Sequence, residues 1–303
     1  MTDLATDRPR APQRLDGLSG ERPLDGRLGL AVAREAWPTA PELKRLEACG
    51  YGWVQLHAPP VAMLADATSR RHWSDCLRAV LAPTGLRVVL HAPDALDLAT
   101  GRHEPALAGL LACAERVGAA TVVLHAGRAR EERALEREEA ALLRGAALAE
   151  RAGLRLALEN LAPCFPIGAD EREPAHAPLF VRDLVRRLDS PAVGMAFDVG
   201  HAHVTAQLDG HSLAHVLDAV ADDVALFHVH DNLGVRRGPG TPPGIMPLRL
   251  DLHMAPGRGT VPWRALAPLL RAHAAPLVME IASGHRPEPL RLATVSAELL
   301  TRA

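Results

Sequence analysis

The sequence has few of the side chains on which nucleic-acid-binding proteins depend. Aromatic residues make up 3% of the 303 residues, so few rings could stack on bases. Lysine occurs once, at Lys44, and the 34 Lys and Arg residues are balanced by 36 Asp and Glu residues. A general nucleic-acid binder carries a basic excess, whereas this chain has a formal net charge of -2. We therefore expect no nucleic acid among its partners.

Features of membrane, secreted and dinucleotide-binding proteins are also missing. No apolar run approaches the roughly 18 residues of a transmembrane helix, so we expect no membrane contact. The four cysteines form no C-x-x-C pair, and unpaired thiols are typical of a reducing compartment, which favours a cytoplasmic protein. No G-x-G-x-x-G follows an early strand, and this argues against the main alternative architecture, a doubly wound open sheet.

The first 26 residues differ from the rest of the chain. Met1 to Gly26 is polar and rich in Arg, Pro and Gly, and it lacks the apolar stretch of a signal peptide. Such a composition cannot bury a core. We therefore expect residues 1–26 to be a disordered leader and residues 27–303 to form one catalytic domain.

Short apolar runs alternate with helical stretches from Arg27 onward. The runs are rich in Val and Leu and nearly unbroken, as in parallel strands that are buried on both faces. They are Leu28–Ala33, Gly52–Leu56, Arg87–Leu90, Thr121–Leu124, Leu154–Leu158, Val193–Phe197, Val224–Phe227 and Pro276–Met279. The stretches between them have apolar residues at helical spacing; examples are Pro41–Cys49, Arg70–Leu81, Glu104–Val117, Ala129–Ala152, Leu179–Leu188 and Ser212–Ala221. This alternation predicts an α/β fold, a single (β/α)8 TIM barrel.

An internal repeat supports the barrel. His57-Ala-Pro, His91-Ala-Pro and His125-Ala-Gly each follow a Val- and Leu-rich run, and His57, His91, His125 and Glu159 are each 34 residues apart. Helical solenoids have similar periods, but they lack a Val-rich strand in each unit.

Residues able to bind metals follow seven of the eight predicted strands. They are His57, His91, His125, Glu159, Asp198, His228 and Glu280. Chemistry in a TIM barrel lies at the carboxyl ends of the strands, so these side chains are expected to converge. His201 follows Asp198 closely, and a long segment after the seventh strand carries Asp251 and His253, which an extended chain would point the same way.

Five motifs resemble those of one family. They are Leu-Ala-Leu-Glu159-Asn160, Asp198-Val-Gly-His201, His228-Val-His230-Asp231-Asn232, Asp251-x-His253-x-x-x-Gly257-x-Gly259 and Val-Met-Glu280. In order and spacing they resemble the xylose-isomerase-like superfamily, also called the sugar phosphate isomerase/epimerase or endonuclease IV family. The resemblance implies a TIM barrel that binds divalent metals at these residues.

The resemblance implies two levels of metal binding. Epimerase members hold one ion with a quartet, which here is Glu159, Asp198, His228 and Glu280. Endonuclease IV members hold three ions, and the further matching ligands are His91, His125, His201, Asp251 and His253. The resemblance would place His91 and His125 on one ion, with Glu159 bridging to the quartet ion. His201, Asp251 and His253 would hold a third ion. His57, His230, Arg258 and Trp263 are candidate substrate contacts, although packing or ligand-orienting roles remain open for each.

The leading hypothesis is a sugar or sugar-phosphate isomerase/epimerase with one to three Mn²⁺, Zn²⁺, Co²⁺ or Fe²⁺ ions. Glu159 and Glu280 would exchange a carbon-bound proton through an enediolate. The alternative is a multinuclear phosphodiesterase, up to an abasic-site endonuclease. Against it, His91-Ala-Pro is followed by the anion Asp94, which would face phosphates. A catalytically silent metabolite-binding protein is a third class, and a homodimer is compatible with all three.

Overall fold

Eight parallel strands form a closed barrel in the computed structural model, which describes residues 23–163, 172–234 and 251–301. The strands pair in the order β1-β2-β3-β4-β5-β6-β7-β8, and β8 closes onto β1. They are β1 Leu28–Ala31, β2 Trp53–His57, β3 Arg87–His91, β4 Ala119–His125, β5 Arg155–Glu159, β6 Val193–Asp198, β7 Val224–Val229 and β8 Leu277–Met279. The predicted TIM barrel is confirmed, and each strand boundary lies within two residues of its expected place.

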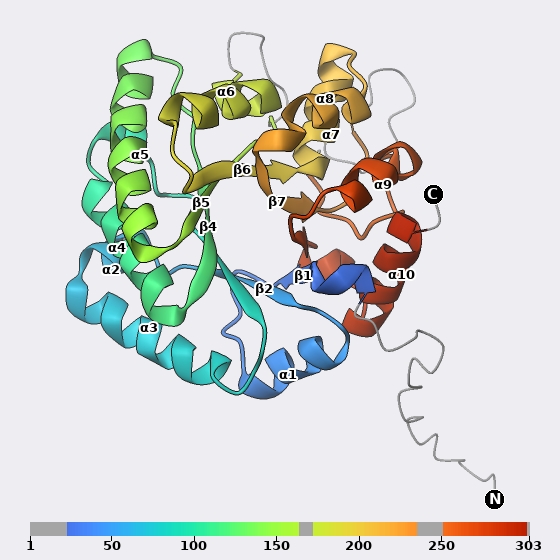
Figure 1. Ribbon diagram of the computed structural model, residues 1–303, viewed down its shortest axis with the longest axis horizontal. Coiled ribbons are helices and arrows are strands. Elements are labelled where there is room, and N and C mark those ends of the chain that lie inside the picture. Colours follow the sequence, from blue (N-terminus) through green and yellow to red (C-terminus); the bar gives the residue numbers. More distant parts are fainter. Residues whose placement is uncertain (1–22, 164–171, 235–250, 302–303) are drawn as a thin grey trace, which may run out of the picture.

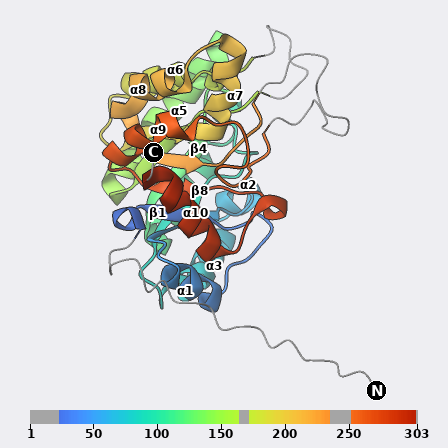
Figure 2. The ribbon, with the colours of Figure 1, turned by 90° about the vertical axis from the view of Figure 1, so that its right-hand side faces the viewer.

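Helices surround the barrel as an outer ring (Figure 1). They are α1 Ala40–Ala48, α2 Val61–Ala65, α3 Ala67–Leu81, α4 Glu104–Val117, α5 Glu132–Ala152, α6 Pro178–Leu188, α7 Val199–Asp209, α8 Leu213–Val220, α9 Trp263–Ala272 and α10 Pro289–Thr301. Helices α9 and α10 face the viewer in the perpendicular view (Figure 2). None of the helices in the described ranges is long and apolar enough to cross a membrane. No amphipathic pattern marks α7, because residues from Val199 to Ala206 are buried on every side.

The barrel has two apolar cores, one inside the strands and one between strands and helices. The inner core takes one residue from each strand: Ala31, Trp53, Val89, Val123, Ala157, Ala196, Leu226 and Val278. Their chain neighbours, such as Leu90 and Leu124, belong to the outer core against the helices. This alternation follows from the pleat of a strand, which turns successive side chains to opposite faces.

The segment before β1 is only partly described. The leader expected over residues 1–26 falls mainly on residues 1–22, which lie outside the described residues. Pro23–Gly26 forms a short 3-10 helix ahead of β1, so these four residues belong to the described fold. Gly26 also lies so close to the start of β2 that a Cβ on Gly52 would stand 2.1 Å from its carbonyl oxygen.

Three of the four cysteines, Cys49, Cys76 and Cys113, are free, as expected. Cys164 lies outside the described residues.

A buried carboxyl group on α5 supports the loop that follows β4. Glu138 is 3% exposed, and its Oε2 accepts a 2.8 Å hydrogen bond from the backbone N–H of Gly127. Burial raises the pKa of Glu138 from 4.5 to about 7. The folded state therefore binds a proton that the unfolded state releases between these pH values, and the stability of the fold falls as pH rises through this window.

Glu138→Gln is expected to remove the loss of stability at high pH, because the amide oxygen still accepts the hydrogen bond from the Gly127 N–H and the amide carries no charge. Its free energy of unfolding should match that of the wild type near pH 5 and exceed it by about 1–3 kcal/mol at pH 8. Denaturant unfolding across this pH range measures the difference, with Glu136→Gln on the exposed face of α5 as the control. A constant difference at all pH values would contradict the assignment.

Candidate metal centre in the barrel mouth

The polar side chains of the mouth form a layer directly above the inner apolar core. Two residues beyond the inner core residue of each of seven strands stand Gln55, His91, His125, Glu159, Asp198, His228 and Glu280. The period of two puts them on the same inward face as the apolar residue before them. The barrel therefore brings together six of the seven predicted strand-end residues, all except His57, in one mouth.

These side chains and their neighbours form three groups that could each hold an ion. One ligand atom from each member lies within 4.8 Å of those of the others in Glu159, Asp198, His228 and Glu280; in His91, Asp94 and His125; and in His201, His230, Asp251 and His253. All nine residues proposed as ligands fall in these groups. Asp94 and His230 are additional members that were not expected as ligands.

The quartet is centred on His228. Its Nδ1 lies 3.1 Å from Glu159 Oε1 and 3.1 Å from Glu280 Oε2. Asp198 Oδ2 is 3.7 Å from the same nitrogen. The side chains of Glu159, Asp198 and His228 are almost completely buried, whereas that of Glu280 keeps 17% of its surface exposed. Glu280 is therefore the quartet member most open to a molecule in the mouth.

Glu159 connects the quartet to the group of His91 and His125. Its Oε2 lies 3.1 Å from His91 Nε2 and 3.2 Å from His125 Nε2, while Oε1 faces His228. The two oxygens of one carboxylate thus face two different groups, which is the geometry of a bridging ligand.

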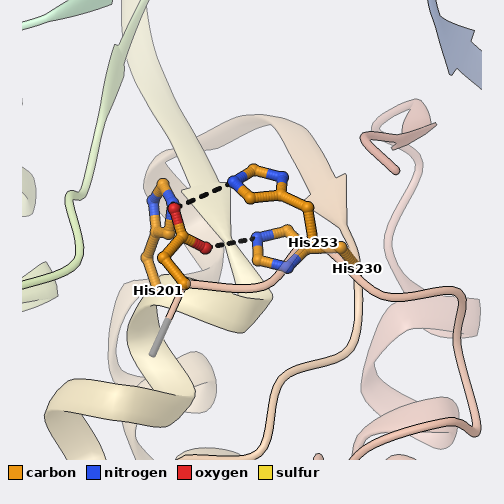
Figure 3. A group of neighbouring side chains, drawn as sticks. His201, His230 and His253 are labelled. Carbon is orange, nitrogen blue, oxygen red and sulfur yellow. Dashed lines mark hydrogen bonds and ion pairs between the residues drawn. The ribbon is translucent and has the colours of Figure 1, made fainter. Parts of the chain in front are cut away.

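The third group gathers three imidazoles from separate segments (Figure 3). His201 lies on α7, His230 follows β7, and His253 comes from the loop before α9. Asp251 Oδ2 is 3.2 Å from His201 Nε2 and 2.9 Å from His253 Nε2. The His230 ring stacks on that of His253 at 3.9 Å between centroids, and its Nε2 lies 2.9 Å from Asp198 Oδ1.

The imidazoles are oriented as metal ligands are. Three of them face a backbone carbonyl with Nδ1: His91 that of Ala92, His201 that of Asn160 and His253 that of Glu280, at 2.7, 2.9 and 2.9 Å. A carbonyl oxygen only accepts, so these nitrogens carry the proton, and a neutral ring presents a lone pair from the other nitrogen to a carboxylate. A cation between the lone pair and the carboxylate resolves their repulsion.

A buried oxygen that accepts no hydrogen bond among the described residues supports the same conclusion. Among the described residues, Asp251 Oδ1 is buried and accepts no hydrogen bond. An unsatisfied buried carboxylate oxygen is costly, and a divalent cation would satisfy it. The mixed imidazole and carboxylate set fits Mn²⁺, Zn²⁺, Co²⁺ or Fe²⁺ better than Ca²⁺.

The electrostatics of the groups demand positive charge. Burial opposes the charge of Glu159, yet the neighbouring His228 and His125 hold its pKa well below the ordinary value. Burial likewise opposes protonation of His228 and His253, but the adjacent carboxylates raise the pKa of His228 to about 9 and that of His253 to about 10. Without a metal, protons on the imidazoles would balance the carboxylates.

The four expected substrate contacts lie in different environments. His57 stands 5.3 Å from the His91 ring and lines a pocket of about 490 Å³ with Arg34 and Trp37. Burial lowers the pKa of His57 to about 4. His230 joins the third group. These two residues border the mouth, although His57 belongs to none of the three groups.

Arg258 and Trp263 lie apart from the groups. Arg258 is exposed and lines a pocket of about 790 Å³ between its own loop and α10. Trp263 is 5% exposed, and its Nε1 donates a 2.9 Å hydrogen bond to Asp231 Oδ2. Its ring is thus part of the packing beneath the loop, and its contact with a substrate stays a prediction.

Gln55 is a member of the mouth that the sequence reasoning missed. It is fully buried on β2, where its Oε1 accepts from His228 Nε2 at 2.8 Å and its Nε2 donates to Glu280 Oε1 at 3.3 Å. It therefore leaves His228 Nδ1 free to bind a cation. The available signal was a polar residue between Val54 and Leu56 in an apolar strand. An amide is a weak metal ligand, so Gln55 was not among the expected site residues.

Gln55→Leu is expected to weaken metal binding by the quartet about 10- to 100-fold, because the His228 tautomer and the Glu280 carboxylate lose their support. Competition titration with a chromophoric chelator measures the dissociation constants. Ser74→Ala, a buried polar change on α3, is the control. Equal affinities for wild type and Gln55→Leu would show that the amide only fills space.

Comparisons with known proteins identify the fold and the family. The family described as xylose isomerase-like TIM barrel matches residues 43–302. No curated protein matches the sequence significantly. A D-tagatose 3-epimerase-like protein of known structure is similar with 17% identity and a TM-score of 0.66, over 91% of this chain and 96% of that one.

Two further structures are similar over nearly the whole chain. The D-allulose 3-epimerase from Methylomonas sp. in complex with D-allulose has 13% identity and a TM-score of 0.64, covering 91% of this chain and 96% of its own. A Thermus thermophilus protein soaked with ZnCl2 has 23% identity and a TM-score of 0.61, covering 91% and 98%. At such identities the likeness shows the fold alone. The family match over residues 43–302, together with the closed barrel, shows that this chain belongs to the xylose isomerase-like TIM barrel family.

Proposed function

We propose that the protein is a divalent-metal-dependent isomerase or epimerase of a sugar or sugar phosphate. The observation that carries this proposal is the quartet, in which Glu159 Oε1 and Glu280 Oε2 each lie 3.1 Å from His228 Nδ1. Two carboxylates on either side of one cation position suit the removal and return of a proton. The epimerase names of two similar structures support the carbohydrate-like substrate.

Glu159, Asp198, His228 and Glu280 would hold the ion at which the substrate binds. When bound, the ion polarises a carbonyl and a neighbouring hydroxyl and so acidifies the carbon-bound proton. The quartet supplies three carboxylates, which leave a divalent ion with about one excess negative charge, and this suits a neutral carbonyl and hydroxyl. Gln55 and the buried Asp198 would keep the ligands in place.

The protein's own carboxylates would move the proton. Glu280 has an exposed edge in the mouth, so it can reach the substrate carbon and take the proton on one oxygen. Glu159 would serve the opposite face, although its Oε2 also faces His91 and His125. Glu280 is therefore the proton carrier with fewer competing contacts, and an enediolate would form between the two transfers.

Glu280→Gln is expected to lower turnover of a ketohexose about 100-fold or more, because the amide cannot accept the proton. Deuterium uptake from D2O into the sugar, followed by NMR, measures proton transfer itself. Glu288→Gln, an exposed residue outside the mouth, is the control. Exchange within tenfold of the wild type would remove Glu280 from this role, provided that both variants retain the wild-type melting temperature.

A multinuclear phosphodiesterase is the second candidate function. The observation that favours it is the convergence of three ligand groups, since three divalent ions and the four carboxylates among the nine expected ligands would leave about two positive charges for an anionic phosphate. Against it, Asp94 adds a fifth carboxylate beside His91 and His125, and the chain has few aromatic residues to stack on bases.

Abasic duplex DNA is therefore expected to remain intact with the Zn²⁺- or Mn²⁺-loaded protein, because the chain has neither a basic excess nor many aromatic residues with which to hold DNA. Gel analysis of an end-labelled duplex gives the answer, and a chelator-treated sample gives the background. Metal-dependent incision 5′ to the lesion would make the phosphodiesterase the better account.

A further inference from the structure

Asp94 joins the group of His91 and His125 from a loop that follows β3. One of its carboxylate oxygens lies within 4.8 Å of a ring nitrogen of both His91 and His125, and Oδ1 is 3.9 Å from His125 Nδ1. It is three residues beyond His91, so the same strand end supplies both side chains. The resemblance to endonuclease IV members implied no ligand role for this residue.

Two arginines hold Asp94 in this position. Arg34 comes from the loop after β1 and binds the carboxylate with both guanidinium nitrogens, Nη2 to Oδ1 at 2.9 Å and Nη1 to Oδ2. Arg128 Nη1 donates to the backbone carbonyl of Asp94 at 2.8 Å. A bidentate pair fixes the plane of a carboxylate, yet each oxygen keeps a further lone pair for a cation.

The resulting ligand set balances the charge of one divalent ion. His91 and His125 direct Nε2 toward Glu159 Oε2, at 3.1 and 3.2 Å, and Asp94 stands beside the two imidazoles. Two neutral imidazoles and two carboxylates neutralise one divalent ion. Four protein ligands are enough to hold a tetrahedral ion.

We propose that Asp94 is a ligand of a metal site with His91, His125 and Glu159, and that Arg34 positions it. The proposal rests on the metal binding proposed above but not on the identity of the substrate. It makes the ion a support for Glu159, whose Oε2 the ion would hold while Oε1 faces His228.

The test compares metal binding in Asp94→Asn, Arg34→Gln and His91→Ala with that in the wild type. Each full-length protein is stripped with a chelator and titrated with Zn²⁺ for stoichiometry and affinity, then with Co²⁺, whose visible absorption is intense for four-coordinate ions and weak for six-coordinate ones. Asp97→Asn in the same loop is the matched control, since Asn keeps the hydrogen bond to the Ala99 N–H.

We expect the wild type to bind an ion at this site besides the quartet ion, and we expect Co²⁺ at this site to absorb as a four-coordinate ion. Asp94→Asn should lower the affinity for that ion at least tenfold and reduce the Co²⁺ absorption at this site, while the affinity of the quartet is unchanged. Arg34→Gln should lower the affinity for the same ion by a smaller factor. His91→Ala should abolish the site, and adding Asp94→Asn to it should then change nothing further.

Three results would overturn the proposal. They are a wild type that binds the quartet ion alone, an Asp94→Asn variant with unchanged affinities, and an Arg34→Gln variant that binds more tightly, since the arginine would then compete with the ion for Asp94. Melting curves of the metal-free variants establish that each is folded. Because the readout is metal binding, absence of epimerase activity in the wild type would overturn the proposed function and leave this site standing.

Discussion

A strand in a closed parallel barrel can turn only every second side chain inward, and the mouth of this protein is built on that constraint. Val89, Ala157 and Leu226 fill the interior, and two residues further along the same strands stand His91, Glu159 and His228. The apolar layer excludes water from below and forms a rigid base. The ligand layer therefore gathers on one face without any loop having to fold over it.

Burying so many ionisable groups together has an electrostatic cost that the chain meets in two ways. Backbone carbonyls of Ala92, Asn160 and Glu280 hold three imidazoles with a lone pair facing inward. Gln55 does the same for His228 and also holds Glu280. The remaining requirement is positive charge, and protons or divalent ions are the species that supply it. The buried Asp251 Oδ1, which accepts no hydrogen bond among the described residues, is one atom that such an ion would satisfy.

Glu159 ties the three groups into one system. Its two oxygens face opposite sides, toward His91 and His125 and toward His228, and its carboxylate is nearly inaccessible. Whatever binds one side therefore changes the charge available on the other. This coupling explains why the number of ions bears directly on chemistry: an ion beside Asp94 would occupy Oε2 of Glu159 and leave Glu280 as the more accessible carboxylate.

How much could be predicted from the sequence differs between strands and contacts. The eight strands and the inward convergence of His91, His125, Glu159, Asp198, His228 and Glu280 follow from local patterns, because burial on both faces makes a strand apolar and the pleat decides which side chains point inward. The 34-residue repeat also equated His57 with His91, and the barrel does pair them in register, but His57 joins none of the groups.

The sequence by itself determined the barrel, its eight strands and the set of residues at their carboxyl ends, because these depend on periodicity along the chain. Only the tertiary structure decided the partners: Arg34 on Asp94, Gln55 on His228, and His230 against His253. It also decided that Trp263 packs against Asp231. These contacts join segments far apart in sequence, and their distances depend on how the barrel closes, which no local pattern encodes.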